Sequence, residues 1–238
     1  KGISLVTLNK HIDKSKYLPD VIKYDRYQPE FYEDTKTYIS KRTSNKKIKI
    51  GSKIYRSNID KINFISKKYN VDKNLLLSLM GIETNFGNYL GKMDIISSLA
   101  TLSYDKRRSE FFTSELITLL KLIDNKIIDP NTLYGSWAGA FGNFQFMPST
   151  IKNYAIDFDN DKKISLKKTE DSFASAANYL NELGWNNSKP CFFKVKLKSN
   201  IPEKYLNISA KNIHSIMKVS YLKKYIQNHN FLDSYKDL

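Results

Sequence analysis

The spacing of hydrophobic residues predicts a series of α-helices between residues 58 and 183. In segment 58–69, Ile59, Ile62, Phe64, Ile65 and Tyr69 fall on roughly one helical face. Asp72 then precedes an apolar run and is a candidate N-cap. Further helices are expected at 93–104, 106–125, 148–155 and 170–183, with Pro148 as a first-turn proline and Gly184 as a C-terminal stop.

The sequence outside this helical region differs in pattern. The first fifty or so residues are polar with interleaved tyrosines, and from Asn187 onward polar and apolar residues alternate as in strands. The predicted fold class is therefore mainly α (α+β), with a small mixed C-terminal segment. Cys191 lies in a strand-like run and is expected to be a small buried residue without a chemical role. As the single cysteine, it can form no intrachain disulfide.

Charge and hydropathy limit the classes of partner. The formal net charge is +15, from 39 Lys and Arg against 24 Asp and Glu, which favours polyanions. The lysines are scattered through a sequence also rich in Asn and Ile, and no nucleic-acid-binding module is recognisable, so we expect no nucleic-acid partner. No apolar stretch is long enough to span a bilayer, and no signal peptide opens the chain.

Glu83 is the strongest candidate for a catalytic residue. It follows the apolar helical run 73–80 and precedes polar residues and Gly87, where hydrophobic core meets solvent. Such a position raises the pKa of a carboxyl group, which then stays protonated near neutral pH and can act as an acid. Taken alone, Glu83 is better described as an exposed residue that ends an ordinary helix, because most acidic residues are simply solvated.

Several motifs in a fixed order decide between these two interpretations. The run 81–87, which contains Glu83, is followed by characteristic runs at 100–104, 107–112, 135–149, 154–159 and 176–180. Together they resemble the membrane-bound lytic transglycosylase B family of peptidoglycan-cleaving enzymes. The resemblance extends from about Asp25 to Trp185. Several motifs in one order are much more specific than any single motif.

The resemblance implies a lysozyme-like helical catalytic core at 71–187. Residues 1–70 would form part of the cleft, and 188–238 the small C-terminal segment. Such an enzyme cleaves the β-1,4 bond between N-acetylmuramic acid and N-acetylglucosamine without water and leaves a 1,6-anhydro sugar. Glu83 would serve first as acid and then as base, whereas ordinary glycosidases use two carboxyl groups. The alternatives are a hydrolysing muramidase on the same fold and a non-catalytic peptidoglycan-binding scaffold.

The resemblance also implies substrate-binding residues. Ser136, Gln145, Tyr38 and Tyr179 match family positions that line the cleft, and Phe144, Phe146 and Met147 are candidates for its wall. Their alternatives are structural, because Ser136 could cap a helix, Gln145 could be a buried amide and the aromatic residues could be core. Arg107 and Arg108 match an arginine pair that would hold acidic groups of peptide stems, with simple solvation as the equal alternative.

A metal site is not expected, although some family members carry a calcium loop here. Asp157, Asp159 and Asp161 match ligand positions one, three and five of an EF-hand-like loop. Position six, usually Gly, is Lys162, and position twelve, usually a bidentate acid, is Lys168. We therefore predict that the lysines hold this loop and that the protein uses no cofactor.

The expected partners are peptidoglycan glycan strands and other cell-wall enzymes in the bacterial periplasm or envelope. We expect export after removal of a signal peptide that is not present in this sequence, and membrane attachment would use a lipid anchor that is also not present in it. The Tyr-Asn motif that usually follows in the family is missing after Tyr225, so either the chain is truncated or that wall of the cleft is built otherwise.

Overall fold

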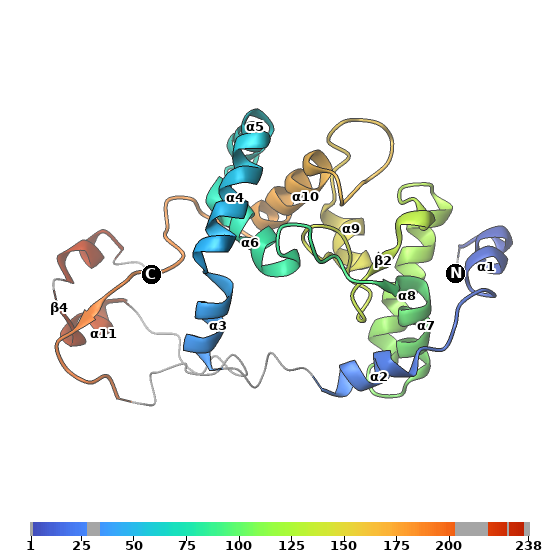
Figure 1. Cartoon of the computed structure of the whole chain (residues 1–238), viewed down its shortest axis with the longest axis horizontal. Helices are drawn as coiled ribbons and strands as arrows, with labels where there is room; N and C mark the ends of the chain where they lie inside the picture. The colour runs from blue at the N-terminus through green and yellow to red at the C-terminus, as the bar shows by residue number, and fades with distance from the viewer. Residues whose placement is uncertain (1, 28–33, 203–218, 228, 236–238) are drawn as a thin grey trace. The chain divides into compact units, whose positions relative to one another are not determined.

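The computed structural model describes residues 2–27, 34–202, 219–227 and 229–235. The chain forms two compact units: the larger contains Lys1–Tyr27 and Arg42–Asn186, and the smaller contains Gln28–Lys41 and Asn187–Leu238. Helices dominate the described residues, and the strands are short (Figure 1), so the mainly α, lysozyme-like fold class predicted from the sequence is confirmed. The functional division at residues 70 and 187 stays a prediction.

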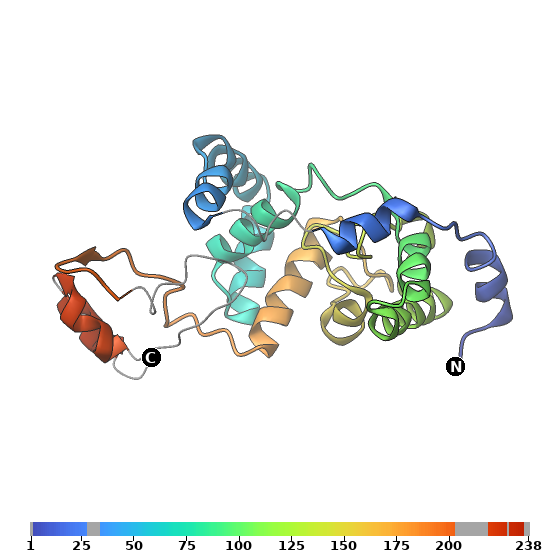
Figure 2. The ribbon, with the colours of Figure 1, turned by 90° about the horizontal axis from the view of Figure 1, so that it is seen from below.

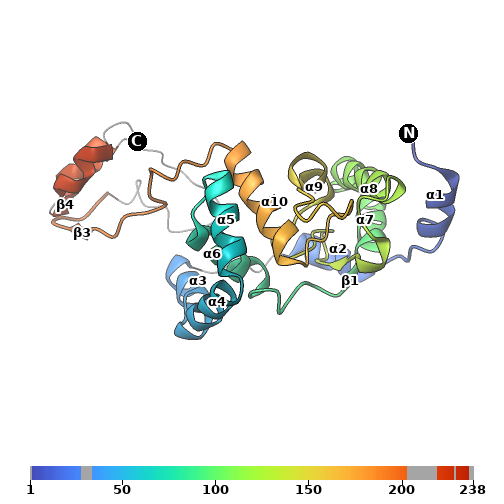
Figure 3. The same ribbon diagram turned by 90° about the horizontal axis from the view of Figure 1, so that it is seen from above.

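The larger unit contains the helices that matter for the candidate site. They are α1 (Leu5–His11), α2 (Pro19–Arg26), α4 (Asn45–Ser57), α5 (Ile59–Tyr69), α6 (Lys73–Thr84), α7 (Ile95–Tyr104), α8 (Ser109–Asp124), α9 (Pro148–Tyr154) and α10 (Thr169–Glu182). Helix α7 packs along α8, which also contacts α9, and α10 packs against α5, α6 and α9 (Figures 2 and 3).

Local sequence signals set several helix ends as predicted. The Asp72 carboxylate accepts hydrogen bonds from the Asn74 and Leu75 amides at 2.7 and 3.2 Å, which caps α6. Pro148 opens α9, and α10 is followed by Gly184 in a left-handed conformation. These caps satisfy backbone groups that have no partner inside the helix.

The hydrophobic core of the larger unit is built from one side of each helix. Ile62 and Ile65 of α5 are fully buried, as the predicted stripe requires. The same prediction was wrong for Ile59 and Phe64, which are 42% and 60% exposed. A helix of this length packs only a narrow stripe into the core, and residues at its margins remain in solvent.

A short strand pair replaces the start of one predicted helix. Helix α7 begins at Ile95 and not at residue 93, because Met93 and Asp94 form β1 (Met93–Asp94), antiparallel to β2 (Tyr134–Gly135). The backbones approach closely at Gly91, where an added Cβ would lie 2.0 Å from the Gly135 carbonyl oxygen. This pair joins the segment that follows Glu83 to the segment that precedes Ser136.

The described part of the smaller unit has little regular structure. It contains most of α3 (Thr35–Arg42), then α11 (Val219–Leu222), two 3₁₀ helices, η4 (Lys223–Tyr225) and η5 (His229–Tyr235), and the antiparallel pair β3 (Lys196–Leu197) and β4 (Ile226–Gln227). The predicted burial of Cys191 was wrong, since the residue is exposed. It lies in a bend between exposed neighbours, where no packed surface covers it. Among the described residues, no helix combines the length and apolar character that crossing a membrane requires.

Candidate active site

Glu83 lies in the last turn of α6, at the surface of the larger unit. Its helix neighbours Gly81 and Thr84 are buried, whereas Ile82 and Glu83 are exposed. The carboxyl group is thus accessible, yet surrounding protein removes part of its water and raises its pKa. Burial is the cause of this shift, as expected from the sequence, and the direction suits a group that must donate a proton.

A buried polar network fixes the end of α6 behind Glu83. The Thr84 hydroxyl donates to the Asn143 backbone oxygen at 2.9 Å and accepts the Gly87 N–H at 2.9 Å. The Asn143 side chain in turn donates to the Lys167 backbone oxygen and the Ser172 hydroxyl at 3.2 and 3.1 Å. Buried groups satisfied in this way hold one geometry. This network was not predicted from the sequence, because its partners are distant along the chain.

The loop that contains Ser136 and Gln145 is brought to the segment after α6. The Gln145 amide donates to the backbone oxygens of Leu90 and Gly142 at 3.4 and 3.0 Å, from a residue in the left-handed conformation. The Ser136 hydroxyl accepts the Ala140 N–H at 3.0 Å, so it stabilises a turn and not the N-terminus of a helix. Both side chains therefore have structural roles, and their roles in substrate binding stay predictions.

The aromatic candidates lie largely in the core. Phe144 and Phe146 are each 7% exposed, and Met147 is partly buried against the core. The Phe146 ring centroid lies 5.6 Å from that of Tyr179, which also contacts Tyr154. Tyr38 belongs to the smaller unit, whereas Glu83 belongs to the larger unit. Whether any of these side chains contacts sugar stays a prediction.

Arg107 and Arg108 pair with an acid inside the protein. Asp25, at 1% exposure, forms ion pairs with both guanidinium groups, and Arg107 also donates to the Asp25 backbone oxygen. The Arg108 guanidinium lies over the Phe112 ring, 4.8 Å from its centroid. These contacts attach α2 to the α7–α8 connection. The structure thus gives the arginine pair a structural role, and its predicted contact with peptide stems stays untested.

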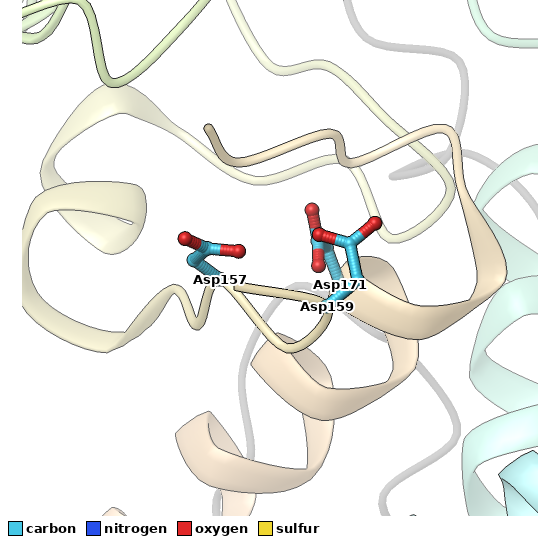
Figure 4. Close-up of side chains that lie close together, drawn as sticks. All are labelled: Asp157, Asp159 and Asp171. Carbon is cyan, nitrogen blue, oxygen red and sulfur yellow. The ribbon is translucent and has the colours of Figure 1, made fainter. Parts of the chain in front are cut away.

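An acidic loop follows α9. One carboxylate oxygen each from Asp157, Asp159 and Asp171 lies within 4.8 Å of the others (Figure 4). Asp171 is fully buried and accepts the Phe158 and Ser165 amides at 2.9 and 2.7 Å, while burial raises its pKa. The Lys168 ammonium contacts Asp159 and Asp161 at 3.0 and 2.9 Å, and these carboxylates hold its pKa well above the usual value.

Comparison with known proteins identifies the family. A family model described as a transglycosylase SLT domain matches residues 1–230. The chain belongs to this family. Membrane-bound lytic murein transglycosylase B of Escherichia coli strain K12 is 42% identical over 127 residues, which cover 53% of this chain and 35% of that protein.

Solved structures show the same relationship. SltB3 from Pseudomonas aeruginosa in complex with NAG-anhNAM-pentapeptide has a TM-score of 0.84 at 30% identity, covering 95% of this chain and 60% of that chain. The Escherichia coli lytic transglycosylase SLT35 in complex with calcium has a TM-score of 0.69 at 34% identity, covering 78% of this chain and 59% of that chain. The chain therefore spans between 35% and 60% of the length of these relatives.

The acidic loop of this family member lacks the acid that an EF-hand loop has at its last position. Calcium takes six to eight oxygen ligands, and an EF-hand loop supplies a bidentate acid at its last position. Here that position is Lys168, whose ammonium contacts two of the would-be ligand side chains. The Asp157 carboxylate accepts the Asp161 and Lys162 amides at 3.1 and 2.8 Å. The prediction that a lysine holds the loop is confirmed for Lys168, whereas Lys162 contributes a backbone N–H.

We expect added calcium or chelator to leave the melting temperature unchanged. Replacing Lys168 by Glu restores an acid at the last position and removes the competing ammonium, so Lys168→Glu is expected to gain a saturable rise in melting temperature with calcium. Lys163→Glu, with the same charge change in the same loop, is the matched control. A calcium-dependent rise in the unmodified protein that Asp157→Asn abolishes would show that the loop binds the ion despite Lys168.

Proposed function

We propose that this chain is the catalytic part of a peptidoglycan lytic transglycosylase. Glu83 donates a proton to the bridging oxygen as the bond from the anomeric carbon of N-acetylmuramic acid breaks. The resulting carboxylate then removes the proton of the C6 hydroxyl of the same sugar, whose oxygen bonds to the anomeric carbon. The products are a 1,6-anhydromuramic end and a free hydroxyl on N-acetylglucosamine, and Glu83 regains its proton.

The observation that supports this proposal most is the environment of Glu83. A single group that acts as acid and then as base needs to be accessible to substrate and to hold a proton near neutral pH. Glu83 is exposed at the end of α6, and its pKa is raised by burial. The assignment of the chain to the transglycosylase SLT domain family supports the same chemistry.

The proposed substrate is the glycan strand of peptidoglycan in the bacterial envelope. Ser136 and Gln145 would hydrogen-bond its hydroxyl and N-acetyl groups, and Tyr179 would pack against a sugar ring. The Gln145 side chain donates a hydrogen bond to the backbone oxygen of Leu90, which follows Glu83 by seven residues, and this contact supports the proposal for Gln145. We further propose that Tyr38, Phe144, Phe146, Met147, Arg107 and Arg108 contribute to binding, and that other cell-wall enzymes are partners.

Digestion of purified peptidoglycan tests this function against a binding role. The chain is expected to release soluble fragments that end in 1,6-anhydromuramic acid. A non-catalytic scaffold would sediment with the insoluble polymer and release nothing. Glu83→Gln provides the matched control, since it should sediment with the polymer equally well. Binding without release by the unmodified chain would contradict the proposed activity.

A further inference from the structure

The backbone leaves α6 in a left-handed turn that begins two residues after Glu83. Asn85 and Phe86 both have left-handed backbone angles, with φ of 50° and 61°. Asn tolerates this region, whereas a bulky residue such as Phe rarely occupies it, so the backbone at Phe86 requires support from its surroundings. The Phe86 N–H donates to the Met80 backbone oxygen at 3.1 Å, which closes the turn over the last residues of α6. Glu83 lies inside this closed segment.

The support comes from the Phe86 ring, which lies against two helix glycines. A Cβ added at Gly81 of α6 would lie 2.6 Å from Phe86 Cζ, and one added at Gly51 of α4 would lie 2.9 Å from the same atom. Gly51 and Gly81 are both buried. Glycine inside a helix is normally unfavourable, so its presence at both contacts is explained by the space that the ring needs.

The residues in contact lie on both sides of Glu83 in the sequence, and the Glu83 side chain is accessible but partly covered by protein. Gly81 precedes Glu83 by two residues, and Phe86 follows it by three. Because the Glu83 side chain is exposed, its position depends mainly on the backbone from which it extends. We infer that Phe86, seated between Gly51 and Gly81, is a positioning residue that fixes Glu83 for the reaction. This inference rests on the proposed function.

Filling the space beneath the ring should displace the turn without breaking the helix. Alanine is a better helix former than glycine, so Gly81→Ala adds only the methyl group that meets Phe86. We expect kcat to fall about 10- to 100-fold, because small displacements of a catalytic group have effects of this size. KM should change less than about twofold, since the loop that contains Ser136 and Gln145 is not altered. Gly51→Ala places the same methyl group against the ring from another helix. It replaces Gly81→Ala in this test if Gly81→Ala does not fold.

A compensating variant separates positioning from general damage. Phe86→Leu removes the ring and should also lower kcat, whereas combining it with Gly81→Ala fills the vacated space. The double variant is expected to have a higher kcat than Gly81→Ala alone, a coupling that independent defects would not show.

Displacement of Glu83 into water should also move the high-pH limb of the kcat profile to lower pH in the single variants. Phe111→Leu, at a 48% exposed ring on α8, is the control and should keep full activity.

The outcomes distinguish the positioning role from the function on which it rests. Reduced kcat in the single variants with recovery in the double variant supports the inference. The positioning role is tested only if the unmodified chain cuts peptidoglycan and Glu83→Gln does not. In that case, full kcat in both Gly81→Ala and Phe86→Leu overturns the role. A reduced kcat in the single variants without recovery in the double variant overturns it as well. An unmodified chain that does not cut peptidoglycan overturns the proposed function together with the inference.

Discussion

Replacing Glu83 by Gln is expected to remove nearly all cutting of peptidoglycan while the fold and binding of the polymer remain. The amide has the same shape as the carboxylic acid and cannot donate a proton as an acid. Loss of a general acid typically lowers the rate about 10²–10⁴-fold, and more when one group serves both steps. Release of soluble fragments under saturating substrate measures the effect. Activity close to that of the unmodified chain would end the assignment of Glu83 as the catalytic residue.

The stability of Glu83→Gln provides an internal check on the environment of this residue. Burial raises the pKa of Glu83 in the folded chain, so the folded state binds this proton more tightly than the unfolded state. This contribution to stability is fully present below the unfolded pKa and is lost as pH rises through the folded pKa. Gln does not titrate. Relative to the unmodified chain, Glu83→Gln should therefore gain stability as pH rises from acid to neutral, and a constant difference would show that burial does not shift this group.

Replacing the buried Asp25 of α2 by Ala is expected to destabilise the larger unit strongly. Asp25 is 1% exposed and pairs with Arg107 and Arg108, so its removal leaves two guanidinium groups without their buried partner. Breaking a buried ion pair typically costs about 3–5 kcal/mol. The arginine side chains are 47% and 37% exposed, and screening by solvent reduces the expected loss to about 2–3 kcal/mol.

Asp20→Ala is the matched control for this prediction. Asp20 lies on the same helix and pairs with Lys23 at 2.8 Å, but the two side chains are 64% and 76% exposed. A surface pair of this kind contributes at most about 1 kcal/mol. The midpoint of urea unfolding should fall clearly for Asp25→Ala and hardly for Asp20→Ala. Equal midpoints would show that the pair between α2 and the α7–α8 connection does not stabilise the fold.

Features that depend on neighbouring residues were predictable from the sequence. The cap at Asp72 and the start at Pro148 follow from groups within one turn of the helix end. The position of Glu83 at the end of α6, and the direction of its pKa shift, follow from the change from apolar to polar sequence around it. These signals act over a few residues, so a single sequence contains them.

Features that depend on distant partners were not predictable in this way. The role of Arg107 and Arg108 depends on Asp25, more than eighty residues earlier, and the support of Thr84 depends on Asn143. Met93 joins a strand because β2 lies beside it, although its own sequence continues the helical pattern. The exposure of Cys191 likewise reflects the absence of a packed surface over its part of the described chain. Residue type alone does not determine tertiary contacts of this kind.

Digestion of peptidoglycan in water enriched in the heavy isotope of oxygen tests the central claim most directly. The claim is that Glu83 directs the C6 hydroxyl of the sugar, and not water, to the anomeric carbon. Mass spectrometry of the soluble fragments should show 1,6-anhydromuramic ends without the heavy isotope, and Glu83→Gln should release almost none of them. A digest by a hydrolysing muramidase in the same water serves as the positive control for incorporation. Fragments from this chain with reducing muramic ends that contain the heavy isotope would contradict the account.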